Sequence, residues 1–289
     1  MPSQIIQWFP GHMAKTRRMI SENLKQVDVV IEILDARIPY SSHNPEIMKI
    51  IESKPMITLL NKASLADPEK TTLFVKKYTA GNRVCIATDC ITGEGLNKIS
   101  PQIKVLMAEK LKRFEEKGMI GRKLRAMVVG IPNVGKSSLI NKISGNKKAK
   151  VENRPGVTLD KQWVSTSLGR DLLDMPGVLW PKFNDRTVGE NLAITGAIKD
   201  TILEIETISL ALVSRMRALY PSLLSDRYKL GNMEQYSKMS DYDIFRLIGK
   251  KRGFLVSGGE INEERTANVL LDEFRSGKLG RITIDRVNE

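Results

Sequence analysis

The residues Gly130-Ile-Pro-Asn-Val-Gly-Lys-Ser137 have the spacing G-x-x-x-x-G-K-[ST] of a phosphate-binding loop. In such a loop the backbone N–H groups surround the β-phosphate, and the glycines let the chain come close to it. The lysine brings positive charge to the β- and γ-phosphates, and the hydroxyl that follows can ligate Mg²⁺. The sequence therefore predicts a nucleoside triphosphate site. Its predicted contacts in this loop are Asn133, Val134, Gly135, Lys136, Ser137 and Ser138.

Two segments further along the chain have residues suited to the γ-phosphate and the metal. Asp174-Met-Pro-Gly177 follows an apolar run, so Asp174 can hold Mg²⁺ through water and the Gly177 N–H can contact the γ-phosphate. Arg154-Pro-Gly-Val-Thr158 precedes it and offers Thr158 as a second hydroxyl for Mg²⁺ in a switch segment. The predicted magnesium ligands are Ser137, Thr158 and Asp174.

Two segments before the phosphate loop resemble the parts of a GTPase that read guanine. Asn61-Lys62-Ala-Ser64 looks like Asn-Lys-x-Asp, and Asp89-Cys90-Ile-Thr-Gly-Glu-Gly95 looks like Ser-Ala-x-x-Gly-x-Gly, whose backbone approaches the base. Each pattern alone is common, but their joint presence after apolar runs is specific. Conventional GTPases have these segments last, so the order here indicates a circularly permuted GTPase with GTP as its substrate. A parallel sheet accepts this order, because each motif still lies at the carboxyl end of a strand.

Position 64 departs from the guanine-recognition pattern, because serine replaces an aspartate that accepts two N–H bonds from guanine. A neutral hydroxyl cannot make that charge-assisted pair. Such a bond contributes about 1.5–3 kcal/mol, so roughly 10- to 100-fold in guanine affinity could be lost. An NTPase with relaxed base specificity is therefore one alternative. Asp89 and Cys90 are also unusual for their segment, but contacts there are expected mainly through backbone N–H groups.

The sequence does not identify the group that orients the attacking water. Val178 follows Gly177 where many GTPases have glutamine, and valine cannot orient water. Asn133 could help to hold a monovalent cation such as K⁺, which would bring positive charge to the transition state. The alternative for Asn133 is a hydrogen bond within the loop. A nucleotide-switched RNA-binding module with negligible hydrolysis is a second function class.

The elements that must position these residues alternate between strands and helices. Strands are expected at Val29–Asp35, Pro55–Asn61, Arg83–Ala87 and from Ala126, with a hairpin formed by Trp163–Ser167 and Asp171–Asp174. Helices are expected within Trp8–Gln26, over Asn97–Lys117 and from Ser138. This alternation predicts an α/β fold of the P-loop NTPase type, with a mainly parallel sheet covered on both faces.

Helical periodicity dominates after Pro181, as in Leu192–Leu212 and Ala267–Phe274. We therefore expect two domains. The first is a circularly permuted GTPase domain at residues 1–184, and the second is a smaller all-helical domain at residues 185–289.

The composition indicates a reduced protein that contacts a polyanion. The net charge is +13, and residues 1–180 contain 29 Lys or Arg against 17 Asp or Glu, whereas residues 181–289 contain 17 against 16. This excess, clustered at Lys110–Arg125 and Lys142–Lys161, favours nucleic acid over a merely solvated basic face. The two cysteines have no nearby metal-ligand partners, and neither a signal peptide nor an apolar stretch of membrane-spanning length is evident.

On these residues the chain is similar to the circularly permuted ribosome biogenesis GTPases of the RbgA/YlqF family, across nearly its full length. The resemblance includes Trp8-Phe-Pro-Gly-His12-Met-Ala-Lys15, Asp35-Ala-Arg-Ile-Pro39, Asn61-Lys62, Gly130–Ser138, Arg154-Pro-Gly, Asp174-Met-Pro-Gly177 and Trp180-Pro-Lys182. In the C-terminal half it includes Thr195–Asp200, Lys251-Arg-Gly253 and Ser257-Gly-Gly259.

The resemblance implies a cytoplasmic protein that binds a late precursor of the large ribosomal subunit, through ribosomal RNA and ribosomal proteins. That particle would stimulate GTP hydrolysis, which would be coupled to release or maturation, and the helical domain would be a second RNA contact. His12 becomes the candidate for orienting the catalytic water. The alternative is that His12 caps its helix or contacts RNA. We expect a monomer that does not bind membranes.

Overall fold

The computed structural model describes residues 10–51, 54–119, 122–144, 162–166, 171–180, 183 and 185–287. Its centre is a six-stranded sheet in the order β3-β2-β1-β4-β6-β5. The strands are β1 (Val29–Asp35), β2 (Met56–Asn61), β3 (Arg83–Ala87), β4 (Arg125–Val129), β5 (Gln162–Ser165) and β6 (Asp171–Asp174). Neighbouring strands are parallel except for the antiparallel pair β5–β6. The predicted parallel sheet and the predicted hairpin are therefore confirmed.

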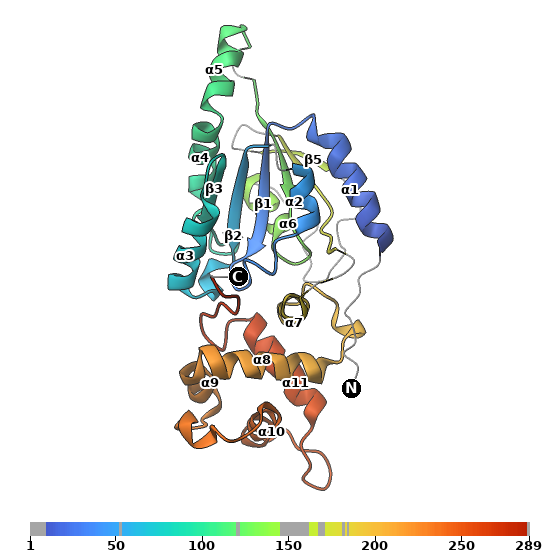
Figure 1. Ribbon diagram of the computed structural model, residues 1–289, viewed down its shortest axis with the longest axis vertical. Helices are drawn as coiled ribbons and strands as arrows, with labels where there is room; N and C mark the ends of the chain where they lie inside the picture. Colours follow the sequence, from blue (N-terminus) through green and yellow to red (C-terminus); the bar gives the residue numbers. More distant parts are fainter. Residues whose placement is uncertain are drawn as a thin grey trace.

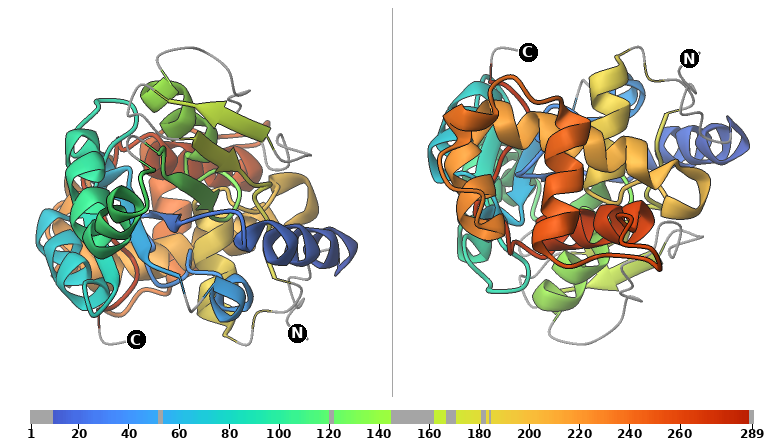
Figure 2. Two further views of the ribbon diagram at one scale, coloured as in Figure 1. Left: turned by 90° about the horizontal axis from the view of Figure 1, so that it is seen from above. Right: turned by 90° about the horizontal axis from the view of Figure 1, so that it is seen from below.

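Helices cover both faces of the sheet, and alternate strand residues face each layer (Figure 2, left). Ile31 and Ile33 of β1 pack in one cluster with residues of α4 and α6, whereas Val30 packs in another with residues of α1 and α2. A third cluster joins β1 and β2 to α3. These helices are α1 (Pro10–Leu24), α2 (Pro45–Ile51), α3 (Pro68–Tyr78), α4 (Ile99–Leu106) and α6 (Lys136–Ser144).

The prediction of a single helix over Asn97–Lys117 is wrong in one respect, because the helix is interrupted at Met107. A short 3₁₀ turn, η2 (Leu96–Lys98), leads into α4, and α5 (Ala108–Glu116) follows the break. Met107 is 3% exposed and packs in the core, while α5 has no buried residue and extends past the sheet (Figure 1). Full burial against the sheet therefore ends at Met107, although Leu111 and Phe114 of α5 still pack, partly buried, against the same core.

The chain beyond the sheet is helical, as predicted, but its first long run is divided. The predicted run Leu192–Leu212 contains the end of α7, a turn and the start of α8, and Gly196 in the turn has φ +76°. A left-handed residue of this kind ends a helix, and glycine adopts it without strain. The elements are α7 (Arg186–Ile194), η3 (Asp200–Ile202), α8 (Ile205–Leu219), α9 (Pro221–Tyr228), η4 (Met233–Tyr236), α10 (Asp241–Lys251) and α11 (Glu263–Arg275).

The C-terminal helices lie beyond the carboxyl ends of the parallel strands, and α7 is the nearest to the sheet (Figure 1). Figure 2 (right) shows these helices in front of the sheet when the molecule is seen from that end. No helix within the described ranges is both long and apolar enough to cross a bilayer. The boundary between residues 184 and 185 stays a prediction.

After α11 the chain returns to the loops at the carboxyl end of the sheet. The N–H groups of Ile282 and Ile284 donate to the carbonyls of Leu65 and Arg37, each over 2.9 Å. We call residues 281–287 the C-terminal tail. The tail therefore joins the end of the chain to the segments that follow β1 and β2.

Candidate functional site

The phosphate loop connects β4 to α6, and close packing explains both of its glycines. A Cβ on Gly130 would lie 2.6 Å from the Ile33 carbonyl oxygen, and one on Gly135 would lie 2.3 Å from the Asn61 amide nitrogen. Gly135 also has φ +102°, which side chains rarely adopt. The backbone of β1 and the side chain at the end of β2 therefore require glycine at these two positions.

Lys136 begins α6 and folds back over its own loop. Its Nζ donates to the carbonyl oxygens of Gly130 and Ile131, over 3.0 and 2.6 Å. Burial lowers the pKa of Lys136 to about 8, and the nearby Asp174 carboxylate only partly offsets this. An ammonium group has three N–H bonds, so one remains for a phosphate oxygen.

Asp174 ends β6 beside this lysine, as the sequence predicted. The side chain is buried, and burial raises its pKa to about 6 against the opposing charge of Lys136. Asp174 Oδ1 has no hydrogen-bond partner among the described residues. A buried carboxylate oxygen without a donor fits a hydrated cation, since Mg²⁺ prefers oxygen ligands and keeps several waters.

Gly177 lies against the same lysine. A Cβ at this position would be 2.4 Å from Lys136 Nζ and 3.1 Å from the Pro132 nitrogen. The strand end that holds Asp174 therefore touches the phosphate loop directly. Lys136, Asp174 and Gly177 form one group, as expected for residues that meet a γ-phosphate and its metal.

Asn61 ties three predicted segments together. Its Nδ2 donates to the Val134 carbonyl over 2.7 Å, and its Oδ1 accepts from the Cys90 N–H over 3.0 Å. The side chain is 2% exposed. One residue of the predicted base-reading segment thus fixes the phosphate loop and the Asp89–Gly95 segment relative to each other.

Lys62 is held by a buried ion network that the sequence did not identify. Lys62 has left-handed backbone geometry, φ 62° and ψ 33°, and its Nζ lies 2.9 Å from Asp35 Oδ2. Arg37 makes a bidentate pair with the same carboxylate, with bonds of 2.9 and 2.7 Å. Burial would raise the pKa of Asp35, but the charges of Arg37 and Lys62 outweigh it and hold that pKa far below its usual range. The sequence signals were an acidic residue at the end of a strand and the place of Asp35–Pro39 in the family resemblance.

Ser64 and Asp89 face each other across the two predicted base-reading segments. The Ser64 hydroxyl donates to Asp89 Oδ2, while Asp89 Oδ1 accepts the N–H groups of Ile91 and Thr92 over 2.8 and 3.0 Å. Burial acts to raise the pKa of Asp89, but these hydrogen bonds outweigh it, so the pKa is lowered. The sequence pointed to each residue separately and did not predict this contact.

One cavity of about 1400 Å³ collects most of the predicted nucleotide contacts. The predicted residues that line it are Asn61, Lys62, Ser64, Asp89, Cys90, Asn133, Gly135 and Ser138. Val134, Lys136 and Ser137 lie in the same phosphate loop. The structure thus brings together the motifs that stand on both sides of the permutation.

The C-terminal helices supply the opposite wall of this cavity, which the sequence did not predict. Thr195, Gly196 and Arg275 line it. Arg275 pairs with both carboxylate oxygens of Asp200 over 2.7 and 2.8 Å and donates to the Ile194 carbonyl over 3.0 Å. The segment Thr195–Asp200 was part of the family resemblance, which was the one available signal.

Asn133 contacts this wall. It has φ 60°, and its Nδ2 donates to the Gly196 carbonyl over 2.6 Å. The expected alternative was a bond within the loop, but the bond reaches the C-terminal helices instead. A role in holding K⁺ stays a prediction.

Three further predictions concern hydrolysis. His12 lies within α1, but its side chain is outside the described residues, as is the whole of Thr158. Val178 is 4% exposed, and its packing with Met175 in an apolar cluster is consistent with its not orienting water. The roles of His12 and Thr158 stay predictions.

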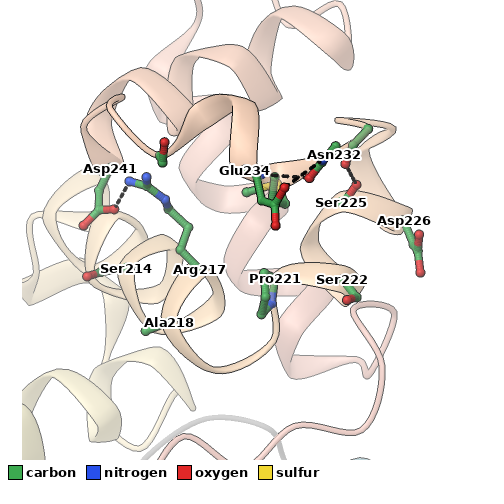
Figure 3. Close-up of a pocket in the computed structure, with 13 residues that line it drawn as sticks. Ser214, Arg217, Ala218, Pro221, Ser222, Ser225, Asp226, Asn232, Glu234 and Asp241 are labelled. Carbon is green, nitrogen blue, oxygen red and sulfur yellow. Dashed lines mark hydrogen bonds and ion pairs between the residues drawn. The ribbon is translucent and has the colours of Figure 1, made fainter.

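A second cavity, of about 730 Å³, lies between α8, α9 and η4 (Figure 3). Its wall includes Arg217, which pairs with Asp241 over 2.6 Å, and Ser225, which bonds the Gly231 carbonyl. These polar groups already satisfy each other. None of the predicted nucleotide contacts lines this cavity, so we place the candidate site in the larger one.

Comparisons with known proteins agree with this geometry. A family model described as "50S ribosome-binding GTPase" matches residues 125–239, beginning at β4. A protein of Bacillus cereus named "Ribosome biogenesis GTPase A" is 44% identical over 285 residues, covering 99% of this chain and 95% of its own. A protein of Priestia megaterium with the same name is 45% identical, covering 98% of both chains.

A solved structure shares the fold. The GNP-bound YlqF from T. maritima is 25% identical, with a TM-score of 0.63, and the match covers 95% of this chain and 99% of that one. The permuted order of the motifs is therefore accompanied by similarity along the whole chain.

Proposed function

This chain belongs to the ribosome biogenesis GTPase A family, and from that premise we propose that the GTPase acts on a precursor of the large ribosomal subunit, which stimulates its hydrolysis of GTP. The observation that supports this most is a single cavity that joins a phosphate loop, base-reading segments and a basic domain to a helical wall. The matched family model, whose description refers to the 50S ribosome, supports the choice of subunit.

Most of the predicted site residues have a proposed role in binding GTP. The backbone from Val134 to Ser138 binds the phosphates, and the third N–H of Lys136 donates to a β- or γ-phosphate oxygen. Ser137 and Asp174 hold Mg²⁺, which would neutralise charge on these phosphates when bound. Thr158 is the proposed third magnesium ligand. Asn61, Lys62 and the Asp89–Cys90 segment surround the base.

The water that attacks GTP needs a partner, because Val178 cannot provide one. We assign this role to His12 on the N-terminal helix, on the family resemblance alone. Asn133 Oδ1 is the proposed ligand for K⁺, while its Nδ2 contacts Gly196. Faster turnover in KCl than in NaCl would support the cation site, and equal turnover would remove it.

Charge supports a contact with ribosomal RNA. Residues 104–125 include eight Lys or Arg and three Glu. Figure 1 shows α5, which belongs to this stretch, at the end of the molecule opposite the C-terminal helices. Clustered cations that face solvent attract the phosphate backbone without reading sequence. We propose that this end and the C-terminal helices both contact the particle, and that the protein is monomeric and cytoplasmic.

Turnover of GTP with and without purified particles tests the proposal. We expect hydrolysis to rise at least tenfold with large-subunit precursors and to stay at the basal rate with small subunits. A rate that is the same with both particles would contradict the proposed partner. A GTPase rate that stays negligible throughout, with nucleotide-dependent binding, would favour a nucleotide-switched RNA-binding module.

A further inference from the structure

We propose that Ser64 and Asp89 together recognise guanine, with Asp89 holding the hydroxyl proton of Ser64 so that Ser64 Oγ faces the base as a hydrogen-bond acceptor. This inference rests on the proposed function, which places GTP in the cavity lined by both residues. It differs from the expectation that serine at position 64 weakens guanine selectivity.

The hydrogen-bond geometry fixes which way the serine proton points. Asp89 Oδ1 accepts two backbone N–H groups, from Ile91 and Thr92, and Oδ2 accepts the Ser64 hydroxyl. A carboxylate has no proton to give, so the hydroxyl must be the donor in this pair. The lone pairs of Ser64 Oγ are left for another donor.

Exposure places the two side chains in the required order. Both residues line the cavity, but Ser64 is exposed whereas Asp89 is only 2% exposed. A ligand in the cavity therefore meets the hydroxyl oxygen first. The carboxylate acts through the serine and polarises it, because hydrogen bonds in a chain strengthen one another.

A hydroxyl whose proton is already donated to Asp89 distinguishes guanine from adenine, whereas a hydroxyl that can either donate or accept does not. The Watson–Crick edge of guanine presents N–H donors at N1 and at its 2-amino group, whereas adenine presents a bare N1 acceptor there. A free serine could serve either base, since its hydroxyl both donates and accepts. A serine whose proton is held by Asp89 can only accept, which suits guanine and leaves adenine N1 unsatisfied.

The two residue types have exchanged places relative to the motifs that they resemble. Asn-Lys-x-Asp has a carboxylate where this chain has Ser64, and Ser-Ala has a hydroxyl where this chain has Asp89. The pair of groups is the same, but the hydroxyl now faces the cavity. Loss of the carboxylate at position 64 is thus compensated at position 89.

Four variants of the pair test the exchange, with affinities for Mg²⁺–GDP, Mg²⁺–ADP and Mg²⁺–xanthosine diphosphate measured by fluorescence titration. In Asp89→Asn the amide keeps an oxygen for the N–H groups of Ile91 and Thr92, but its NH₂ now donates to Ser64. We expect the GDP-to-ADP affinity ratio to fall at least tenfold and xanthosine diphosphate, whose C2 carbonyl accepts, to gain relative to GDP. Ser64→Ala should lower GDP affinity without favouring xanthine.

The double variant Ser64→Asp/Asp89→Ser has the carboxylate and the hydroxyl in the usual motif positions, so it should have the wild-type GDP-to-ADP affinity ratio. Ser64→Asp alone puts two carboxylates side by side and should not keep that ratio. An unchanged ratio in a folded Asp89→Asn protein, or unchanged GDP affinity in Ser64→Ala, would overturn the inference. The variant Lys136→Ala distinguishes failure of the guanine inference from failure of the proposed function. If Lys136→Ala leaves GDP and ADP affinity intact, the proposed site is wrong, whereas loss of both with an unchanged Asp89→Asn ratio removes only the guanine inference.

Discussion

Asn61 illustrates how the side chains of this site are held before a nucleotide binds. Its amide spans the phosphate loop and the Asp89–Gly95 segment, while Asp35, itself paired with Arg37, holds Lys62. Preorganised groups lose little conformational entropy on binding. The polar residues that surround the site therefore set its geometry, in addition to those that would touch GTP.

Gly177→Ala tests the contact between the strand end and the phosphate loop. The added methyl would lie 2.4 Å from Lys136 Nζ, so it displaces the end of a flexible side chain. We expect GTP turnover to fall about tenfold or more, while the free energy of unfolding changes by less than about 1 kcal/mol. Steady-state kinetics and urea unfolding check the two parts. If Gly177→Ala hydrolysed GTP as fast as the wild type, GTP hydrolysis would not require Lys136 Nζ at this position.

Asp35→Asn tests the ion network behind Lys62. It leaves the buried Arg37 without its carboxylate, so we expect a loss of roughly 3–5 kcal/mol in the free energy of unfolding at pH 7. Asp35 has a lowered pKa, so its stabilising effect is complete above the unfolded value near 3.8 and is lost as the pH falls below it. Urea unfolding should show a constant difference from wild type between pH 7 and 5, and a smaller one below 3.8. A difference that grows towards low pH would contradict this sign.

At the scale of the elements, the C-terminal tail is the least expected connection. Asp285 accepts the Ser41 N–H and hydroxyl over 2.8 and 2.6 Å and the Asn191 amide over 2.8 Å. It therefore joins the loop after β1, helix α7 and the end of the chain. Tyr220 adds to this connection, since its hydroxyl donates to Asp67 at the start of α3 and accepts the Thr283 N–H.

Asp285→Ala tests the tail as a structural connection. Removal of this buried carboxylate leaves the donors of Ser41 and Asn191 without it, so we expect a loss of roughly 3 kcal/mol in the free energy of unfolding. Chemical denaturation measures it. Arg286→Ala, at the exposed neighbouring position, is the matched control and should change stability by less than about 0.5 kcal/mol. If the two substitutions lowered the free energy of unfolding equally, this would argue against the tail as a structural connection.

Sequence predicted the elements that carry local signals and missed those set by distant contacts. The strands and the phosphate loop followed from apolar runs and glycine spacing. The break at Met107 did not, because the helical pattern of the sequence continues through this position. The sequence of the tail does not indicate which residues it contacts, because the bond from Ile284 to Arg37 joins positions far apart in the chain. The Ser64–Asp89 pair was likewise hidden, because its members are 25 positions apart in the sequence.

For the whole molecule, the cavity lies at the interface between the sheet and the C-terminal helices, while α5 lies at the far end (Figure 1). Arg275 and Gly196 line one wall, and the Asn133 amide bonds the Gly196 carbonyl. A nucleotide in the cavity would touch both parts. GTP and GDP could therefore set different positions of the helices, which is how we expect the nucleotide state to reach the particle.

Charge reversal on α5 tests the interaction at the far end of the molecule. Lys112→Glu with Lys117→Glu should weaken binding to large-subunit precursors and reduce the slope of log affinity against log salt by about one for each RNA phosphate that is no longer neutralised. GTP affinity should not change, because α5 contributes no residue to the cavity. Co-sedimentation between about 50 and 200 mM salt measures the slope. The matched reversal Glu115→Lys with Glu116→Lys should leave binding as strong or stronger, and equal weakening by both pairs would exclude an electrostatic interaction.

The C-terminal tail also has a consequence for how the protein is made. Translation produces the guanine-reading loops early, whereas Ile282 and Ile284, which bond the carbonyls of Leu65 and Arg37, are added more than 200 residues later. A nascent chain that stops before residue 281 lacks these bonds, so its base-reading loops should be more open to protease than those of the released protein. Limited proteolysis of stalled chains would show this difference. Synthesis itself would then delay a competent nucleotide site until the C-terminal tail has been made.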